Sequence, residues 1–455
     1  MRVDRWLKLT KKDGLNLELL KSTLEVSNPD YLSRKKMGLS TNGLRRFDPV
    51  YVEIGEELWV PRAIVHKYDG RDIEDKTVSG KDVDFKSKIE LGPNENRKED
   101  QEKWVSDLVG ILQRRYGTVG QAEPGWGKTV AALEVIARLG KTTAVLVHKE
   151  FLMNQWIERI QDCYDIDESE IGFVQQDRCD YEGKKIVLIM IQSLLARDYS
   201  PDLFEYFGTV VVDEVHRMSA VEFRKVITMF PGRYRLGVTA TPKRKDGLED
   251  VFFWHIGSIG AIGSKRKIKP RVEIVKTNVN PSPRDWMNLM DFKRDVSLSK
   301  LTTYLAEHEE RNQRIARLAY KALVARRKIL ILSGRRVQLE ILHQLVKRQM
   351  LRHGKRFPMG YYVGGMTDKQ RVISSTRPLI LGTYQMAEEG LDIPDLDTLF
   401  LVTPKADIEQ AVGRILREVD GKKEPLVVDF LDESIGVCNG LHRKRLSQYK
   451  KLGYV

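Results

Sequence analysis

The chain has 455 residues, too many for one ordinary core, and its 41% hydrophobic and 31% charged residues fit a soluble globular protein of two or three domains. No apolar run is long enough to span a membrane, and the segment MRVDRWLKLTKKDG is not expected to be a secretory signal. Three cysteines without zinc or redox spacing predict reduced thiols in a cytoplasmic protein. The net charge of +13 favours a polyanionic partner, and no membrane partner is expected.

Residues 1–90 differ in pattern from the rest of the chain. YVEIGEELWVPRAIV (51–65) is rich in β-branched and aromatic residues and predicts a hairpin, and the polar segment 69–84 predicts a loop or linker. We therefore predict a small β-containing (α+β) N-terminal domain. Its stretch SRKKMGLSTNGLRR (33–46) is basic and interrupted by glycines.

Two stretches of alternating strands and helices follow, over residues 91–265 and 266–455. Such alternation predicts parallel sheets covered on both faces, so the fold class is α/β with two similar tandem domains. The strands of the first stretch are predicted at 142–147, 185–191, 208–213 and 234–239. Those of the second are predicted at 328–333, 378–383, 397–402 and 425–430.

The positive charge gathers in two regions. Residues 308–356 contain 14 Lys/Arg and 3 Asp/Glu, and residues 1–50 contain 11 and 6. A charge run is commonly a solvated helix face, but two such regions in one basic chain favour nucleic acid.

AEPGWGKT (122–129) is a candidate phosphate-binding loop that precedes a helical stretch. A helix N-terminus offers unpaired N–H groups and a positive dipole end, and Gly125 and Gly127 allow the backbone to curl around phosphates. Lys128 would reach the β and γ phosphates, and the Thr129 hydroxyl would hold Mg²⁺. Ala122 replaces the usual first glycine and Trp126 lies in the middle, so the loop needs support from its context.

That support comes from VVVDEVH (210–216), an apolar strand that ends in two carboxylates. Asp213 would contact Mg²⁺ through water, and Glu214 would polarise the attacking water of a phosphoryl transfer. The alternative is a solvated acidic turn, which the phosphate loop upstream disfavours.

The string Asp213-Glu214-Val215-His216 resembles the DExH signature of superfamily 2 helicases, and the remaining motifs follow in that family's order. Gln101 with Arg97 resembles the Q motif, and AEPGWGKT resembles motif I in its form that begins with alanine. The strings at 145–156, 190–194, 238–242, 331–336 and 382–394 resemble motifs Ia, Ic, III, IV and V, and QAVGRILR (410–417) matches motif VI. The DEVH string, the Arg244 and Asp246-Gly247 after motif III, and residues 298–323 resemble the XPB-related and phage UvsW-type branch.

This resemblance, which covers residues 95–430, implies two tandem RecA-like domains and an ATP-dependent DNA helicase or translocase that uses ATP and Mg²⁺. The UvsW-type branch implies fork and Holliday-junction unwinding and branch migration in phage-type DNA replication, recombination or repair, in the cytoplasm of a bacterium or a phage-infected host. The implied partner is branched DNA with single-stranded/duplex junctions; the oligomeric state stays open, with a monomer favoured. The N-terminal domain would bind that DNA, and its basic stretch 33–46 is either a contact with a DNA junction or a solvated loop. A duplex translocase with little unwinding, an RNA helicase and a binding module with a decayed motor are the alternatives.

The resemblance also assigns residues to roles. The catalytic set is Lys128, Asp213, Glu214, Gln410, Arg414 and Arg417, with Arg417 as the arginine finger. The ATP-binding set is Arg97, Gln101, Pro124, Gly125, Trp126, Gly127, Lys128, Thr129, Gly390 and Asp392, and Thr129 and Asp213 would serve Mg²⁺. The DNA-binding set is Gln155, Trp156, Gln192, Ser193, Thr239, Gly334, Arg335, Thr383, Tyr384 and Gln385. Trp156 is alternatively a core residue, and Thr239 and Thr241 would link the ATP and DNA sites.

Overall fold

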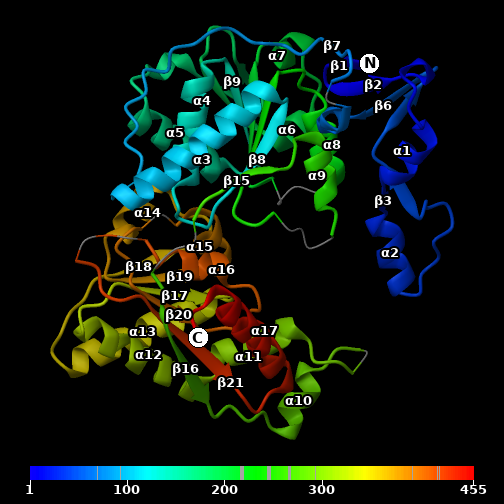
Figure 1. Ribbon diagram of the computed structural model, residues 1–455. Helices are drawn as coiled ribbons and strands as arrows, with labels where there is room; N and C mark the ends of the chain where they lie inside the picture. The colour runs from blue at the N-terminus through cyan, green and yellow to red at the C-terminus, as the bar shows by residue number, and fades with distance from the viewer. Residues whose placement is uncertain are drawn as a thin grey trace. The chain divides into compact units, whose positions relative to one another are not determined.

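A computed structural model describes the chain except for Asp69, Pro93, 216–219, 243–246, 265–267, Lys293, Asp392, Glu418, Asp420 and the side chains of Asp368 and 388–390. The predicted His216, Arg244, Asp246 and Asp392 therefore lie outside the described residues. The chain divides into two compact units, residues 1–265 and 266–455 (Figure 1). Within the described part, no helix is both long and apolar enough to cross a membrane.

The first unit begins with a small sheet in the order β5-β6-β2-β1-β7. Its strands are β1 (Arg2–Val3), β2 (Trp6–Leu9), β5 (Val52–Ile54), β6 (Glu57–Pro61) and β7 (Glu74–Asp75), with η1 (Lys11–Asp13), α1 (Leu17–Thr23) and η2 (Arg62–Tyr68) beside them. The antiparallel pair β5-β6 confirms the predicted hairpin. A separate two-stranded sheet, β3 (Glu25–Ser27) with β4 (Phe47–Pro49), carries α2 (Pro29–Lys36) between its strands.

The larger sheet of the first unit has the order β11-β10-β12-β9-β13-β14-β8-β15, and every pair except β10-β11 is parallel. Its strands are β8 (Gly117–Gln121), β9 (Thr143–Val147), β10 (Ile171–Gln175), β11 (Arg178–Asp180), β12 (Ile186–Met190), β13 (Thr209–Asp213), β14 (Tyr234–Thr239) and β15 (Ile259–Ile262). The helices are α3 (Glu95–Arg114), α4 (Lys128–Leu139), α5 (Glu150–Cys163), η3 (Glu168–Glu170), α6 (Ile191–Ala196), α7 (Pro201–Glu205), α8 (Ala220–Ile227) and α9 (Glu249–His255).

Both faces of this sheet are covered because successive side chains of a strand point to opposite faces. On β13, Val211 joins one buried cluster with the residues of α3, α4 and α5. Its neighbours Val210 and Val212 join a second cluster with α8 and α9.

Two buried arginines fasten the small N-terminal sheet to the larger sheet. Arg62, 0% exposed, donates to the carbonyl oxygens of Asp4, Tyr116, Gly232 and Arg233. Arg235, at the start of β14, is also 0% exposed and donates to the carbonyl oxygens of Arg5, Phe230 and His255. Burial lowers the pKa of Arg62 to about 9, which shows how fully it is removed from water.

The second unit has one parallel sheet in the order β16-β21-β20-β17-β19-β18. Its strands are β16 (Arg271–Thr277), β17 (Ile329–Ser333), β18 (Met359–Tyr362), β19 (Leu379–Thr383), β20 (Thr398–Leu401) and β21 (Leu426–Asp432). Its helices are α10 (Pro283–Leu289), α11 (Leu298–Glu307), α12 (Glu309–Val324), α13 (Arg336–Arg352), α14 (Asp368–Ser375), α15 (Tyr384–Gly390), α16 (Glu409–Gly413) and α17 (Gly436–Leu452). The predicted fold class is confirmed.

Two buried ion pairs tie the helices of the second unit to β21. Arg311 on α12 donates through Nε and Nη2 to both oxygens of Asp432, at 2.7 and 3.1 Å, and both side chains are almost fully buried. On α17, Arg445 Nε and the Tyr449 hydroxyl donate to Asp429 Oδ2 at 2.8 and 3.3 Å. These carboxylates are therefore neutralised by arginines of the same unit.

Candidate nucleotide site and nucleic-acid surface

The phosphate loop joins the end of β8 to the start of α4. Gly125 and Gly127 have φ of +73° and +103°, the left-handed region that favours glycine. Gly127 caps α4, and a Cβ there would lie 2.4 Å from Gln101 Nε2. Lys128 follows directly, and its Nζ donates to the Glu123 carbonyl oxygen at 3.3 Å. Pro124 and Thr129 are half-buried in this loop and in the first turn of the helix.

Trp126 belongs to the core of the first unit. The side chain is 2% exposed, and its ring lies 5.4 Å from that of Trp104 on α3. The indole Nε1 donates to Asp100 Oδ2 at 2.6 Å, and the Arg97 guanidinium lies 5.9 Å from its ring. The tryptophan thus anchors the loop to α3.

The Gln101 side chain holds the phosphate loop by binding a main-chain oxygen of that loop. Gln101 Nε2 donates to the Trp126 carbonyl oxygen at 2.7 Å, and its Oε1 accepts from the Gly92 N–H at 2.8 Å. Asp100, its neighbour, also accepts from the Ser264 backbone and hydroxyl. Sequence reasoning did not assign Asp100 to the site, although an acidic residue before Gln101 and an indole donor in the loop were the available signals.

The two carboxylates of the acidic motif lie at the end of β13 and directly after it. Asp213 ends the strand and is 8% exposed, whereas Glu214 adopts a φ of +47°. A left-handed residue other than glycine costs roughly 1–3 kcal/mol, and such strain gathers at functional sites. Burial, followed by the charge of Glu214, raises the pKa of Asp213, and the ammonium of Lys128 opposes that rise. Lys128 therefore lies within electrostatic range of the acidic strand.

Trp156 orients the first of these carboxylates. Its ring, on α5, is 1% exposed, and the indole Nε1 donates to Asp213 Oδ2 at 2.9 Å. The enclosed ring presents no face to a strand of DNA in this structure. The role that its geometry supports is to hold Asp213, an acid–indole contact that the sequence alone did not suggest.

Three neighbouring strands bring the motifs of the first unit together. β13, β14 and β8 are adjacent and parallel, so the residues after their carboxyl ends share one edge of the sheet. The Ala122 N–H donates to the Thr239 carbonyl oxygen at 3.1 Å, and the Thr239 hydroxyl donates to the Thr241 carbonyl oxygen at 3.0 Å. The end of β14 is thus bonded directly to the phosphate loop.

Further along this edge lie the polar residues after β9, β10 and β12. Exposed Gln192 donates through Nε2 to the His148 carbonyl oxygen at 2.9 Å, and buried Ser193 accepts from the Gln176 N–H at 2.9 Å. Gln155 is half-buried on α5. Of the predicted DNA contacts in this unit, Gln192 has the most accessible side chain.

In the second unit, Thr403 joins two of the predicted motifs. Its hydroxyl accepts from the Gly334 N–H at 2.8 Å, and its carbonyl oxygen accepts from the Tyr384 hydroxyl at 3.2 Å. Tyr384 is 6% exposed, while the neighbouring Gln385 is exposed and Thr383 is half-buried. These residues lie at or just after the ends of β17, β19 and β20. Because β17 pairs in parallel with both β19 and β20, the structure brings them to one edge of the sheet.

Arg335 is held by α11. Its guanidinium donates to the Thr303 hydroxyl and to Ser299, each at 2.8 Å. A buried chain of hydrogen bonds also holds its backbone. The Arg335 N–H donates to the Ser333 hydroxyl at 3.0 Å, and that hydroxyl donates to Gln338 Oε1 at 2.7 Å. Gln338 Nε2 in turn donates to Asn312 Oδ1 at 2.9 Å. Helices α11 and α12, within the stretch 298–323 that resembles the UvsW-type branch, therefore position motif IV.

The predicted residues of motif VI lie at and just after α16. Gln410, Arg414 and Arg417 are half-buried, and the Arg417 carbonyl oxygen accepts from Lys422 Nζ at 2.9 Å. Gly390 ends α15. These residues belong to the second unit, and Lys128 and Asp213 belong to the first.

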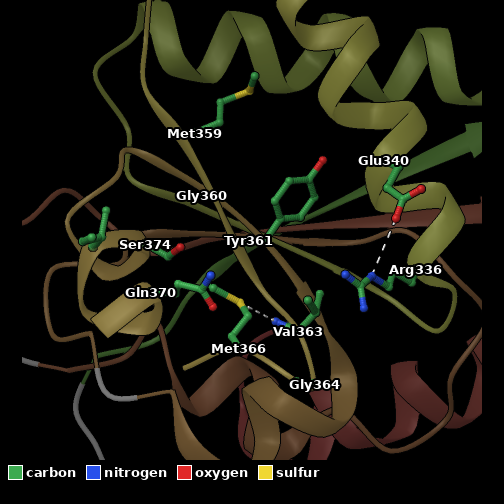
Figure 2. A pocket seen from close by; sticks show the side chains of 12 residues that line it. Arg336, Glu340, Met359, Gly360, Tyr361, Val363, Gly364, Met366, Gln370 and Ser374 are labelled. Atoms are coloured by element: carbon green, nitrogen blue, oxygen red, sulfur yellow. Dashed lines mark hydrogen bonds and ion pairs between the residues drawn. The ribbon is translucent and has the colours of Figure 1, made fainter. Parts of the chain in front are cut away.

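The second unit also contains a groove of about 570 Å³ that sequence reasoning did not find (Figure 2). It runs along β18 between the start of α13 and α14, and Tyr361 lies between the Arg336–Glu340 ion pair and Gln370. An aromatic ring, a guanidinium and an amide line this groove. They come from three consecutive elements, α13, β18 and α14, and the sequence carries no recognised motif there apart from the Gly364-Gly365 turn.

Comparisons with known proteins give the family. Residues 94–244 match the family described as the res subunit of type III restriction enzymes. A protein of Acanthamoeba polyphaga mimivirus, whose name describes an ATP-dependent RNA helicase, is 30% identical over 414 residues, which cover 89% of this chain and 77% of the relative. The chain belongs to the superfamily 2 helicases.

The chain is also similar to a further sequence relative and to a solved structure. The DNA 3'-5' translocase XPB2 of Sulfurisphaera tokodaii is 26% identical over 414 residues, covering 81% of this chain and 86% of the relative. A fragment structure of an HsdR subunit of a type I restriction enzyme from Vibrio vulnificus aligns with a TM-score of 0.51 and 16% identity, over 74% of this chain and 64% of that one, and supports the fold alone. The predicted family is thus confirmed, and the helicase uses ATP and binds nucleic acid.

Proposed function

We propose that this helicase remodels branched DNA: it hydrolyses ATP to unwind forks and Holliday junctions and to migrate branches, in phage-type DNA replication, recombination or repair. The motif strings of the UvsW-type branch and the name of the XPB2 relative, a DNA translocase, support DNA as the substrate. The name of the mimivirus relative supports the alternative of an RNA helicase. A duplex translocase with little strand separation is the second alternative.

The acidic strand carries the proposal of ATP hydrolysis. Asp213 is buried beside Glu214, and its direct side-chain donor among the described residues is the neutral indole of Trp156. A desolvated carboxylate pair of this kind favours a cation, which fits Mg²⁺. We propose that Thr129 and Asp213 hold Mg²⁺, which neutralises phosphate charge when it is bound.

Side chains of the protein bind the phosphates and activate the attacking water in this proposal. Lys128 neutralises the β and γ phosphates, while the N–H groups of the loop bind their oxygens. Glu214 orients the attacking water and accepts its proton. The bond between the loop and the end of β14 would then carry a change at the phosphates to Thr239 and Thr241.

Motif VI supplies the remaining catalytic charge in this proposal. Arg417 would stabilise the γ-phosphoryl group in the transition state, assisted by Arg414 and Gln410, with Gly390 and Asp392 near the nucleotide. Because these residues come from the second unit, hydrolysis would require both units to act on one nucleotide. That requirement is how ATP binding and release would drive movement along DNA.

The DNA contacts in this proposal are largely to phosphates and sugars, because a motor must ignore base sequence. Exposed Gln192 and Gln385 and the backbone near Gly334 are the best placed of the predicted residues. Binding should weaken with salt, with a log–log slope of about −0.9 for each phosphate neutralised on duplex DNA.

One comparison tests the substrate. The ATPase rate of the full chain is measured with matched lengths of single-stranded, duplex, forked and four-way DNA and of RNA, together with strand separation on the branched substrates. We expect forked and four-way DNA to stimulate most and to be unwound. Stronger stimulation by RNA would support the RNA helicase, and duplex stimulation without strand separation would support the translocase. Lys128→Ala measures the background rate, and wild-type turnover no higher than that background would contradict ATP hydrolysis at this site.

A further inference from the structure

An arm of the N-terminal region, residues 31–47, combines exposed cations with exposed apolar side chains. Between Tyr31 and Phe47 the sequence has five Lys/Arg and no Asp/Glu. Leu32, Met37, Leu39 and Phe47 are 49%, 67%, 57% and 42% exposed, and no residue of α2 is buried. In Figure 1 α2 lies at the far end of this arm, beyond β3 and away from the sheet β5-β6-β2-β1-β7.

The cations of the arm have no carboxylate partner in the described part of the chain. They are Arg34, Lys35, Lys36, Arg45 and Arg46, and all five are exposed. Arg34 donates to the Ser40 carbonyl oxygen at 3.4 Å, and the Arg46 guanidinium lies 5.1 Å from the Phe47 ring. By contrast, Lys21 on the neighbouring α1 pairs with Glu18 and Glu53. The arm therefore presents uncompensated positive charge.

The root of the arm, strands β3 and β4, is held against helix α8 of the first unit. β3 and β4 pair through Ser27 and Phe47 at the end of the hairpin, and Asn28 Nδ2 donates to Asp48 at 3.0 Å. Val26 and Val50 pack in the same cluster as the apolar residues of α8. Arg224 on α8 donates to the Pro49 carbonyl oxygen.

The element that receives this root is close in sequence to the catalytic acids. α8 begins at Ala220, six residues after Glu214. The root of the arm is therefore bonded to the helix that begins six residues after Glu214. This placement distinguishes the arm from an ordinary solvated loop, which would have no buried root packed against α8.

We propose that the arm is a strand-separating element of the helicase: its cations bind phosphates beside a junction, and Met37 and Leu39 at its tip contact the faces of bases that the junction exposes. Positive charge suits phosphate, and apolar side chains inserted at a base step unstack it. Exposed apolar side chains beside uncompensated positive charge suit a partner that offers both phosphates and base faces. The proposal rests on the proposed action on branched nucleic acid.

The test uses three changes of the full-length chain. Met37→Ser with Leu39→Ser removes the apolar tip. Arg34, Lys35, Lys36, Arg45 and Arg46 are changed to Gln in a second variant. In a third, residues 29–45 are replaced by an Asn-Gly turn, which suits a two-residue hairpin between Asn28 and Arg46. Leu19→Ser, at an α1 side chain that is 63% exposed, and Lys11→Gln with Lys12→Gln are the matched controls outside the arm.

Two measurements separate the arm from the motor: the ATPase rate with single strands, and the fluorescence of 2-aminopurine at a fork junction bound in the presence of a non-hydrolysable ATP analogue. We expect the tip variant to lose the fluorescence increase and to unwind forks about tenfold more slowly, because the wedge that unstacks the junction is gone. Its single-strand ATPase should stay within about twofold of wild type, as in the controls. The cation variant should bind forks with a salt slope reduced by about one for each phosphate that it no longer neutralises.

Wild-type fluorescence and unwinding in both the tip variant and the hairpin replacement would overturn the arm's role while leaving the motor intact. If wild type itself neither hydrolyses ATP with nucleic acid nor unwinds forks, the proposed function fails instead. An arm that captures anionic vesicles or a protein, with unchanged fork binding in the cation variant, would also overturn the proposal. A thermal melting midpoint equal to that of wild type verifies that the replacement folds.

Discussion

Buried carboxylates of the two units differ in the charge of their side-chain donors. In the second unit, Asp432 and Asp429 each receive a guanidinium, from Arg311 and Arg445. In the first, Asp213 is also buried, yet its side-chain donor is the neutral indole of Trp156, with the ammonium of Lys128 acting at longer range. A carboxylate that the fold neutralises serves stability. In the proposed function, the carboxylate whose side-chain donor is neutral receives a cationic ligand.

The arginines of the second unit provide the largest expected effect. If Arg311 and Arg445 stabilise the fold while Arg417 serves ATP, Arg417→Ala should lower kcat for ATP about 10³-fold or more at saturating nucleic acid. The midpoint of urea unfolding should not change. Arg443→Ala, at an exposed position of α17, is the control. A variant that keeps near wild-type kcat would remove Arg417 from the catalytic set.

The next effect is on stability. Arg311→Ala leaves Asp432 buried without its partner and should reduce the free energy of unfolding by about 3–5 kcal/mol. The exposed pair Arg271–Glu273 gives the control, since Arg271→Ala should cost about 0–1 kcal/mol. Urea denaturation measures both. Equal losses would mean that the buried pair is not structural, and recovery of stability in Arg311→Met with Asp432→Leu would sharpen the assignment.

The smallest effect concerns the indole that holds Asp213. Trp156→Phe removes the N–H donor, a loss of about 1 kcal/mol, together with part of a buried ring. It should lower kcat for ATP by up to about tenfold. Trp59→Phe removes the same kind of bond, Nε1 to Glu57 at 2.8 Å, in the N-terminal sheet and is the matched control. If both variants hydrolyse ATP like wild type, Trp156 is only a core residue.

The strands that sequence predicted are those whose side chains fill both faces of a sheet. β13 and β17 are fully buried and therefore consist largely of β-branched or aliphatic residues. β8, which leads into the phosphate loop, lacked such a signal because its residues are GTVGQ. A Cβ at Gly117 would lie 2.1 Å from the Ile256 carbonyl oxygen, and one at Gly120 would lie 2.2 Å from the Trp104 ring. Close packing of neighbours has replaced the apolar side chains that the pattern requires.

For the candidate site, sequence predicted which motifs matter but not how they are held. Trp126 and Asp100 lie 26 positions apart, and Trp156 and Asp213 lie 57 apart, so no local pattern connects either pair. The two indoles were visible only as large aromatic residues within motifs. The roles of Gln410, Arg414 and Arg417 and of the DNA-binding residues stay predictions.

Arg62 and Arg235 have a consequence for how such an enzyme can evolve. Each guanidinium reaches across the junction between the small sheet and the first parallel sheet to bind main-chain oxygens on both sides. A hybrid that joined a foreign N-terminal region at residue 90 would leave Arg235 buried with part of its acceptors missing, at a cost of several kcal/mol. Substrate preference should therefore change more readily by variation within the arm, whose exposed residues make none of these bonds, than by exchange of the whole N-terminal region.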